Sequence, residues 1–292
     1  MLAMREAYLV GALGTLRLTI SHAGKYGDLI WSLPAIRAAA RALGTHVRLW
    51  LPESLSSIAP LLKRQTYIAD VILDPAWKVL DTAPVTPWLP PVVSGSAEEP
   101  VIHLGHREWP TDILPIYTMS LLQQQWKPAW GPMPRLRLEE PWIASSCRLA
   151  RYNIMATYSD AWIELKYGVT AAVATKLGRE ITILHASNSR WDEFPETDRL
   201  VTFRERNWLD AADELASAEL ALGSLSALSV LAAAVGTPRV LFEPNEHAHH
   251  PIFQHWDTPL VNGSDGRPTF DSRHIADAVR AKLRELNEPL RS

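Results

Sequence analysis

Residues 16–42 read LRLTISHAGKYGDLIWSLPAIRAAARA, and this stretch decides the fold that we expect for the chain. It begins with a β-prone run at Leu16–Ile20, which Gly24 and Gly27 close. From Leu29 onward apolar residues recur at helical spacing, and the alanines near the end are strong helix formers. A strand, a tight glycine turn and a helix in this order predict the start of a β–α–β unit.

The same alternation continues along the chain. Runs at His46–Leu51 and Tyr67–Leu73 predict two further strands, and Ser57–Leu62 suggests a helix between them. Strands that alternate with helices form parallel sheets with crossover connections, so this order predicts an α/β fold. Later strands are expected at Val101–Leu104, Tyr152–Thr157, Glu180–His185, Glu219–Leu222 and Arg239–Phe242. Later helices are expected at Ile113–Gln125, Ile163–Leu177, Trp208–Ala218, Leu225–Val235 and Ser272–Leu286.

Two interruptions divide this pattern. Trp77–Glu99 is rich in Pro, Ser and Trp and is typical of a folded surface loop, whereas Pro132–Trp142 suggests a boundary between domains. We therefore expect one Rossmann-like domain at residues 1–142 and a second at residues 143–292. Two α/β domains of this kind bind ligands in the cleft between them, at the carboxyl ends of their strands.

Length, charge and cysteine content exclude several classes of protein. The chain has 292 residues, 29 Lys and Arg against 32 Asp and Glu, 47% hydrophobic residues and one cysteine. This composition excludes wholesale disorder, an intramolecular disulfide framework and a cysteine-rich zinc site. A net charge of −3 gives no global attraction to nucleic acid.

The N-terminus superficially resembles a signal peptide. Ala7–Leu16 is a short apolar run, but Arg17 ends it and the strand that follows leads straight into the glycine turn. No uncharged stretch reaches the ~18–20 residues that a transmembrane helix needs. The sequence therefore predicts a cytoplasmic protein without an integral membrane segment.

The glycine turn is the first candidate for chemistry. Gly24 and Gly27 permit a tight turn and a close approach of a ligand to the backbone. Asp28 falls at the start of the helix, where free N–H groups favour anions, and its position alone suggests an N-cap. The turn is not a Walker A loop, since Lys25 follows the first glycine, and it lacks the G-x-G of a dinucleotide fingerprint.

Residues 24–35, GKYGDLIWSLPA, resemble the N-terminal motif of the heptosyltransferase-like glycosyltransferases. That motif is G-x-x-G-D, two apolar residues and then a leucine–proline pair. The resemblance implies the GT-B architecture, two Rossmann-like domains with parallel sheets facing across a cleft. It also implies that Asp28 is the general base that takes a proton from the acceptor hydroxyl. The acceptor-side loop of the cleft is then formed by Gly24, Lys25, Tyr26 and Gly27.

Residues 222–238, LGSLSALSVLAAAVGTP, resemble the family's donor-binding signature. Hydroxyls at a helix N-terminus, here Ser224 and Ser226, suit the diphosphate of a nucleotide-sugar, because the N–H groups and the dipole meet the anion without a metal. They would also stabilise the charge on the leaving diphosphate. The chain departs from the family at Leu225, Ala227 and Val230, where the family has Asp, Gly and His.

Residues 152–162, YNIMATYSDAW, resemble the strand and loop that open the family's second domain. The family carries a phosphate-gripping lysine just before the tryptophan, where this chain has Ala161. Lys166 could reach round to that place, but a solvated lysine on the helix surface is the more ordinary interpretation. The tryptophan itself, Trp162, is expected to be a packing residue. The donor-binding residues that the resemblance implies are Ser159, Ser224, Ser226, Ala227, Glu243 and Asn245.

The sequence predicts neither a resident metal nor a cofactor. Residues 246–250, EHAHH, together with His255, have the nitrogen density of a metal site, but neighbours in one loop seldom converge on an ion. The chain also lacks a D-x-D motif. We therefore expect a metal-independent site whose co-substrate is a nucleotide-diphosphate sugar.

These patterns together predict an inverting glycosyltransferase that moves a sugar from a nucleotide-diphosphate sugar to an acceptor hydroxyl. The N-terminal domain would bind the acceptor and the C-terminal domain the donor. The acceptor stays open between a surface glycan and a hydroxylated base in bacteriophage DNA, which would be a DNA modification. Two other classes also stay open: a sugar-nucleotide epimerase or hydrolase on the same fold, and a non-catalytic nucleotide-sugar-binding protein.

Overall fold

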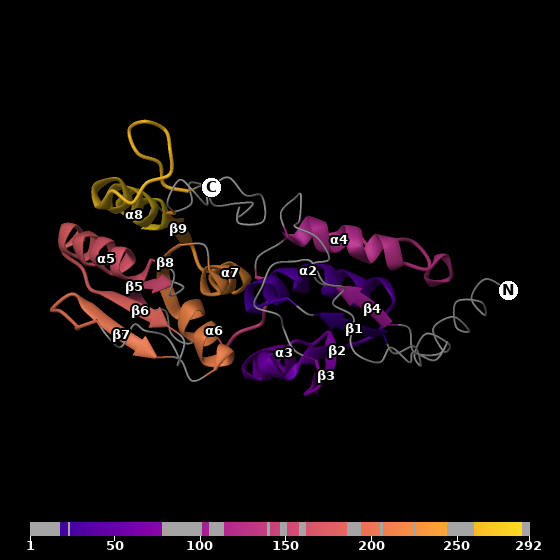
Figure 1. Cartoon of the computed structure of the whole chain (residues 1–292). Coiled ribbons are helices and arrows are strands. Elements are labelled where there is room, and N and C mark those ends of the chain that lie inside the picture. The colour runs from indigo at the N-terminus through magenta and orange to yellow at the C-terminus, as the bar shows by residue number, and fades with distance from the viewer. Residues whose placement is uncertain are drawn as a thin grey trace. The chain divides into compact units, whose positions relative to one another are not determined.

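The chain divides into two compact units, Met1–Trp142 and Ile143–Ser292, each built around its own sheet (Figure 1). The computed structural model describes residues 18–22, 24–77, 101–104, 114–138, 141–146, 151–157, 162–185, 194–204, 207–224, 226–243 and 260–287. Within these residues every pair of neighbouring strands in the two sheets is parallel. The predicted α/β fold with two parallel sheets is therefore confirmed.

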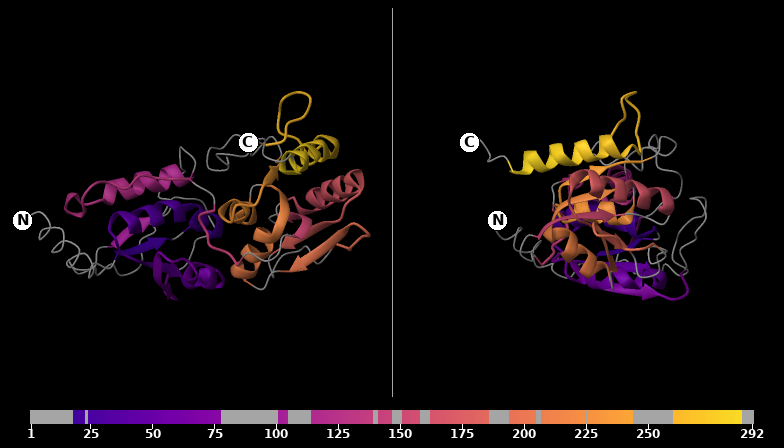
Figure 2. Two further views of the ribbon diagram at one scale, coloured as in Figure 1. Left: turned by 180° about the vertical axis from the view of Figure 1, so that it is seen from behind. Right: turned by 90° about the vertical axis from the view of Figure 1, so that its left-hand side faces the viewer.

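The first unit is a four-stranded sheet in the order β3-β2-β1-β4. Its elements are β1 (Leu18–His22), α2 (Tyr26–Ala42), β2 (Val47–Pro52), η1 (Glu53–Ile58), α3 (Ala59–Lys63), β3 (Ile68–Asp74), β4 (Val101–Leu104), α4 (Leu114–Gln125) and η2 (Pro128–Trp130). Helices α2 and α4 pack together on one face of the sheet and α3 lies on the other (Figures 1 and 2). The chain runs outward from β1 to β3 and then returns beside β1 as β4. The order therefore reverses between β1 and β4, which is where open α/β sheets bind ligands.

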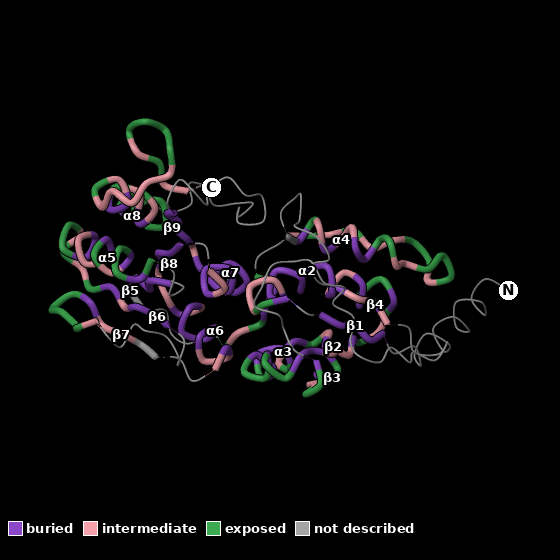
Figure 3. The backbone as a smooth tube through the Cα atoms, in the orientation of Figure 1, coloured by how far each residue is buried: buried purple, intermediate pink, exposed green. Residues whose placement is uncertain are grey.

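Helix α2 is the central packing element of the first unit, and it contains a proline. Most of its side chains from Leu29 to Ala40 are buried against the sheet and α4 (Figure 3). Pro34 has no N–H, so the carbonyl of Ile30 one turn earlier receives no helical hydrogen bond from it. The indole N–H of Trp142, which is 2% exposed, donates to that carbonyl at 3.1 Å. The last residue of the unit is thereby anchored on α2.

The second unit is a five-stranded sheet in the order β7-β6-β5-β8-β9. Its elements are β5 (Arg151–Thr157), α5 (Ile163–Leu177), β6 (Ile181–His185), β7 (Leu200–Arg204), α6 (Trp208–Ser217), β8 (Ala218–Gly223), α7 (Ala227–Ala234), β9 (Arg239–Leu241) and α8 (Ser272–Asn287). Helices α5 and α8 pack together, as do α6 and α7. The strand order reverses between β5 and β8, at the middle of the sheet.

Strand β7 was missing from the sequence prediction. It is a five-residue edge strand that pairs only with β6 among the described strands, from Leu200 opposite Ile181 to Arg204 opposite His185. Its sequence, LVTFR, is too short and too polar at its end to stand out as a strand by itself. These five residues form a strand because their backbone pairs with β6, and the local sequence pattern does not show that pairing.

Candidate functional site

The turn from β1 into α2 lies at the point where the order of the first sheet reverses. The Gly24 N–H donates to Nδ1 of His22, the last residue of β1, at 3.1 Å. A Cβ on Gly24 would lie 2.7 Å from both the Asp28 Cβ and the His22 Cε1. No side chain therefore fits at this position without displacing Asp28 or His22, which explains the first glycine of the motif.

Asp28 lies in the first turn of α2. The helix begins at Tyr26, so Asp28 is the third helical residue and Lys25 occupies the N-cap position. The Lys25 N–H donates to the Asp28 Oδ2 at 3.0 Å, and the Asp28 side chain is half-buried. The expected helix start at Leu29 was three residues late, so the N-cap interpretation of Asp28 was wrong. A carboxylate in this place is favoured by the helix dipole.

A chain of hydrogen bonds from inside the unit holds the backbone of Asp28. Because His22 Nδ1 accepts from Gly24, the ring proton lies on Nε2, which donates to the Ser32 Oγ at 2.9 Å. The Ser32 hydroxyl in turn donates to the Asp28 carbonyl at 2.8 Å, and the Thr118 Oγ1 lies 3.2 Å from the Ser32 Oγ. His22 and Ser32 are each 1% exposed. The histidine thus fixes both the glycine turn and the first turn of α2.

The remaining residues of the predicted acceptor loop differ in what they do. The Tyr26 hydroxyl donates to the Ser54 carbonyl at 2.9 Å and lies 2.8 Å from the Ser57 Oγ, so this side chain ties α2 to η1. Lys25 is exposed, and Gly27 is half-buried. The contact of Lys25 with Asp28 is thus made by its backbone N–H, while the residue itself is exposed.

A histidine that the sequence analysis missed lies on β4, next to β1. His103 pairs with Ser21, and its Nδ1 lies 2.6 Å from the Ser21 Oγ. The side-chain amide of Gln125 on α4 bonds both the N–H and the carbonyl of His103, each at 2.8 Å. The only feature of the sequence that could have indicated this contact was a polar residue, His103, in the otherwise apolar four-residue strand β4.

Two buried hydroxyls lie where the order of the second sheet reverses. Thr157 ends β5, and it pairs with Gly223, which ends β8 and precedes Ser224. The side chains of Thr157 and Ser224 are fully buried, and their hydroxyls have no hydrogen-bond partner among the described residues. Leaving a buried hydroxyl unpaired costs about 1–3 kcal/mol, so two at one sheet edge point to a ligand.

The start of α7 lies beside these hydroxyls. The Ser226 Oγ accepts the Ser229 N–H at 3.2 Å, and the Ser229 Oγ accepts the Ser226 N–H at 3.0 Å, so the two serines form a capping box. The Ser226 hydroxyl also lies 3.4 Å from the Thr157 carbonyl. The N–H groups of Ala227 and Leu228 have no partner within the helix and are available to an anion.

Gly223 allows the two strand ends to come this close. A Cβ at Gly223 would overlap with the Thr157 hydroxyl and lie 2.9 Å from its carbonyl oxygen. The Phe242 N–H donates to the Gly223 carbonyl at 2.9 Å, which brings Glu243 to the same edge after β9. Glu243 is 5% exposed. The structure thus brings together four predicted donor-site positions, namely Ser224, Ser226, Ala227 and Glu243.

Two expectations about α5 were wrong. Lys166 is not solvated but only 1% exposed, because the fourth residue of α5 faces the interior of the unit. Trp162, expected to be a packing residue, is 47% exposed and has a φ of 59° at the N-cap of α5. A bulky residue at positive φ is strained by about 1–3 kcal/mol, and such strain clusters at ligand sites.

Other predicted features lie outside the described residues. These are Ser159, Asn245 and the histidine-rich loop at 246–255. Within the described part of the chain no group of three His, Cys, Asp or Glu residues could hold a metal ion. None of the described helices is long and apolar enough to cross a membrane.

The comparisons with known proteins identify the fold. A scan against protein-family models finds no match, and neither does a search of curated proteins. Among solved structures, the glycosyl transferase family 9 from Veillonella parvula DSM 2008 has a TM-score of 0.59 at 11% identity, over 93% of this chain and 98% of that one. The E. coli ADP-heptose lps heptosyltransferase II has a TM-score of 0.59 at 13% identity, over 93% and 100%. This is the heptosyltransferase fold.

A second heptosyltransferase structure agrees with these two. The E. coli heptosyltransferase WaaC with ADP has a TM-score of 0.56 at 13% identity, over 92% of this chain and 99% of that one. The resemblance read from residues 24–35 is thereby confirmed at the level of the fold. The heptosyltransferase fold extends over nearly the whole chain, through both units.

Proposed function

We propose that the chain is an inverting, metal-independent glycosyltransferase. The observation that carries this proposal is the pair of buried, unpartnered hydroxyls of Thr157 and Ser224 beside the first turn of α7. A diphosphate placed there would accept hydrogen bonds from both hydroxyls and from the N–H groups of Ala227 and Leu228. These donors belong to the protein, and their hydrogen bonds together with the helix dipole would stabilise the charge of a diphosphate without a metal ion.

The donor nucleotide would be held by the second unit. The exposed indole of Trp162 at the start of α5 offers a stacking face for the base, a contact worth about 1–3 kcal/mol. The same hydrogen bonds to the diphosphate become stronger as it leaves and gains charge, which lowers the barrier to transfer. Glu243 follows β9 at the same edge, and we propose that it contacts the base or the sugar.

The acceptor would be held by the first unit, with Asp28 as general base. Asp28 takes the proton of the acceptor hydroxyl while that oxygen forms a bond to the anomeric carbon. The bond between the anomeric carbon and the diphosphate oxygen breaks, and the diphosphate leaves with its electron pair from the opposite face. Proton transfer of this kind contributes typically 10²–10⁴-fold to rate. The acceptor hydroxyl belongs to a surface glycan or to a hydroxylated base in DNA.

The decisive variant is Asp28→Asn. Asparagine keeps an oxygen for the Lys25 N–H, so α2 keeps its first turn, but it cannot take a proton. We expect transfer to fall by about 100-fold or more while nucleotide binding is unchanged. The matched control is Asp70→Asn, since Asp70 is an exposed carboxylate of the same unit that also accepts a backbone N–H. Full transfer activity in Asp28→Asn would overturn the assignment.

The nucleotide is identified by a thermal-shift panel of ADP, UDP, GDP, CMP and dTDP with and without magnesium. Binding to the folded state raises the melting temperature in proportion to RT ln(1 + [L]/Kd). We expect one nucleotide to stabilise the protein without magnesium. Consumption of the matching sugar donor without any acceptor would instead favour a hydrolase or epimerase on the same fold.

A further inference from the structure

The outer face of α4 is unusual for a helix on a protein surface, because it carries no charge. The helix reads LPIYTMSLLQQQ, and its exposed residues include Ile116, Gln123 and Gln124. Ile116 is 43% exposed. The face of a surface helix that points away from the core usually carries charged and polar residues. An exposed isoleucine is ordinary by itself, but here no charged side chain of the helix lies beside it.

Helix α8 on the second unit shows the ordinary case in the same chain. Its exposed leucine, Leu286, is 41% exposed and follows the exposed charges of Arg280 and Glu285. Around α4, by contrast, the whole stretch of residues 113–138 contains no Asp or Glu, although the chain has 32 of them in 292 residues. This part of the first unit is therefore free of negative charge in a chain whose net charge is −3.

Two tryptophans lie in the turn that follows α4, residues 126–131, which we call the aromatic turn (Figure 3). The rings of Trp126 and Trp130 meet edge to face, with their centroids 5.1 Å apart, and both residues are half-buried. The Trp126 indole N–H donates to the Gly131 carbonyl at 3.2 Å, and the Trp130 N–H donates to the Lys127 carbonyl at 3.0 Å. These bonds hold both rings at the surface of the unit.

The surface that the aromatic turn presents is apolar with a cation beside it. Because the indole N–H of Trp126 is already bonded within the turn, what its ring offers to the outside is apolar. The Lys127 Nζ lies 5.6 Å from the centroid of the Trp130 ring. Tryptophan is enriched at the boundary between membrane and water, and lysine there rests its apolar stem on the surface while its charge stays in water.

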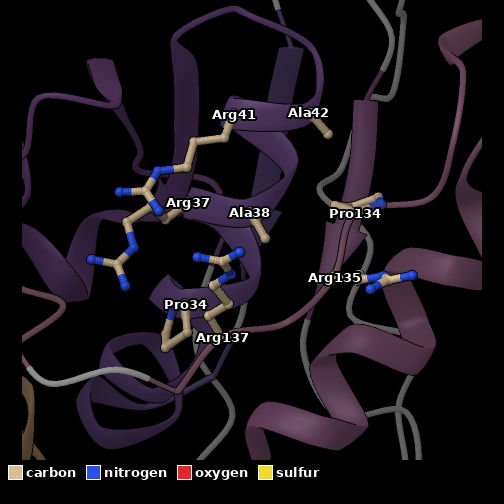
Figure 4. Close-up of a pocket in the computed structure, with 8 residues that line it drawn as sticks. All are labelled: Pro34, Arg37, Ala38, Arg41, Ala42, Pro134, Arg135 and Arg137. Carbon is tan, nitrogen blue, oxygen red and sulfur yellow. The ribbon is translucent and has the colours of Figure 1, made fainter.

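A second exposed cation follows the aromatic turn. Lys127 and Arg135 are both exposed. In Figure 4 the guanidinium group of Arg135 points away from those of Arg37, Arg41 and Arg137, which lie together on the other side of the pocket drawn there. The charge of Arg135 is therefore directed away from the arginines of α2.

We propose that the outer face of α4 and the aromatic turn bind the surface of an anionic lipid membrane. The Trp126 and Trp130 rings and the Ile116 side chain would enter the boundary between headgroups and acyl chains, while Lys127 and Arg135 would pair with lipid phosphates. A carboxylate on this surface would be repelled by anionic headgroups, which accounts for the stretch without Asp or Glu. This contact is peripheral, and it goes beyond sugar transfer without depending on it.

Two other occupants fit this surface less well. Nucleic acid is bound by neutralising many phosphates, whereas residues 113–138 have three cations beside many apolar side chains. A second copy of the chain would bind through the same patch on both copies, which places Lys127 and Arg135 near their own equivalents. Like charges then oppose the contact, whereas an anionic membrane attracts them.

The test is co-sedimentation of the full chain with lipid vesicles. Vesicles of phosphatidylcholine are compared with vesicles in which part of this lipid is replaced by phosphatidylglycerol. We expect binding to the anionic vesicles to be about tenfold or more tighter than to the neutral ones, since each cation near an anionic surface adds attraction. High salt should weaken it, because salt screens exposed charges.

Two variants with matched controls assign the binding to this surface. Lys127→Glu with Arg135→Glu should weaken binding to anionic vesicles by about tenfold or more. Ile116→Ser should weaken it by about threefold or more, because less apolar surface leaves water. The controls are Lys63→Glu, an exposed lysine of the same unit, and Leu286→Ser on α8, and both should bind as the natural chain does.

Any of four results would overturn the proposal. They are no sedimentation with anionic vesicles, binding unchanged in the double variant and in Ile116→Ser, an equal loss of binding in the controls, and binding of a DNA duplex in place of the vesicles. Self-association without vesicles that Ile116→Ser abolishes would also overturn it, by assigning the surface to a second copy. If the double variant melts at a lower temperature than the natural chain, Ile116→Ser decides alone, because it lies outside the aromatic turn.

Failure of the membrane surface and failure of the transferase can be told apart. The vesicle assay contains neither nucleotide nor acceptor, and the double variant should keep the thermal shift with the nucleotide that the natural chain binds. A chain that binds vesicles through these residues but binds no nucleotide would overturn the glycosyltransferase alone. A chain that binds the nucleotide but no vesicles would overturn the membrane surface alone.

Discussion

At the scale of single residues, the unpaired hydroxyls of Thr157 and Ser224 should lower the stability of the free protein and strengthen the binding of a nucleotide. A buried hydroxyl without a partner weakens the folded state, so an apolar replacement of similar shape should strengthen it. We expect Thr157→Val and Ser224→Ala to stabilise the unliganded protein by up to about 1 kcal/mol. Both should also weaken nucleotide binding by about tenfold, because the diphosphate loses a hydrogen bond.

Urea unfolding and calorimetric titration of the same samples measure both effects. The control is Thr175→Val, which removes a hydroxyl that already bonds the Ala171 carbonyl on the exposed side of α5. That control should gain no stability and should bind the nucleotide normally. If Thr157→Val loses stability and binds the nucleotide as tightly as the natural chain, the two hydroxyls are not part of a ligand site.

Other residues show which features could not be predicted from the sequence. Asp28 could be singled out in the sequence because its motif is contiguous, and its catalytic role stays a prediction. The structure adds the reason for Gly24, because a Cβ there would overlap with Asp28 and His22. Lys166 was expected on the surface because lysine is rarely buried, yet it is 1% exposed. Trp162 was expected to pack, yet it is exposed. Burial of a single side chain depends on what packs over its helix, and the local pattern does not contain that information.

At the scale of elements, a proline inside α2 leaves one backbone carbonyl free to accept a hydrogen bond from a side chain outside the helix. Pro34 leaves the Ile30 carbonyl without a helical donor, and Trp142 Nε1 supplies one at 3.1 Å. We expect Trp142→Phe to lower the free energy of unfolding by about 1–3 kcal/mol, because the carbonyl is then buried and unpaired. In a Pro34→Ala background the new N–H can bond the same carbonyl, so Trp142→Phe should cost less there.

A double-mutant cycle in urea separates this hydrogen bond from the packing of the indole. The coupling free energy between positions 34 and 142 is the difference between the two costs of Trp142→Phe. The control is Trp31→Phe, which changes another buried indole on α2 and should cost the same in both backgrounds. Equal costs of Trp142→Phe with and without Pro34 would show that the freed carbonyl does not matter.

The elements themselves were predicted better than their ends. Apolar periodicity located the strands and helices around both motifs, since crossover α/β units repeat on a regular pattern. The apolar pattern placed the start of α2 at Leu29, but the helix begins at Tyr26, because the Asp28 carboxylate accepts the Lys25 N–H and stabilises the first turn. It missed β7, whose few residues become a strand only by pairing with β6. Capping bonds and edge pairing depend on partners, so a local pattern cannot show them.

At the scale of the whole molecule, the two units use the same plan. In each, the chain runs outward in one direction, returns to the other side of its first strand, and places a glycine-containing motif at that reversal. The first unit has the turn with Asp28, and the second has Gly223 and the start of α7. The sequence predicted both motifs, but the reversal points that explain their positions follow only from the strand order.

This common plan separates the sites by unit, and hydrogen exchange can test the separation. With the nucleotide found in the thermal-shift panel bound, amides in the first turn of α7 and just after Trp162 should exchange about tenfold more slowly, because the diphosphate and the base cover them. The nucleotide should leave the amides of α2 unchanged, and sodium sulfate at equal ionic strength should slow exchange at none of these amides. Nucleotide protection confined to α2 would reverse the assignment of donor and acceptor units.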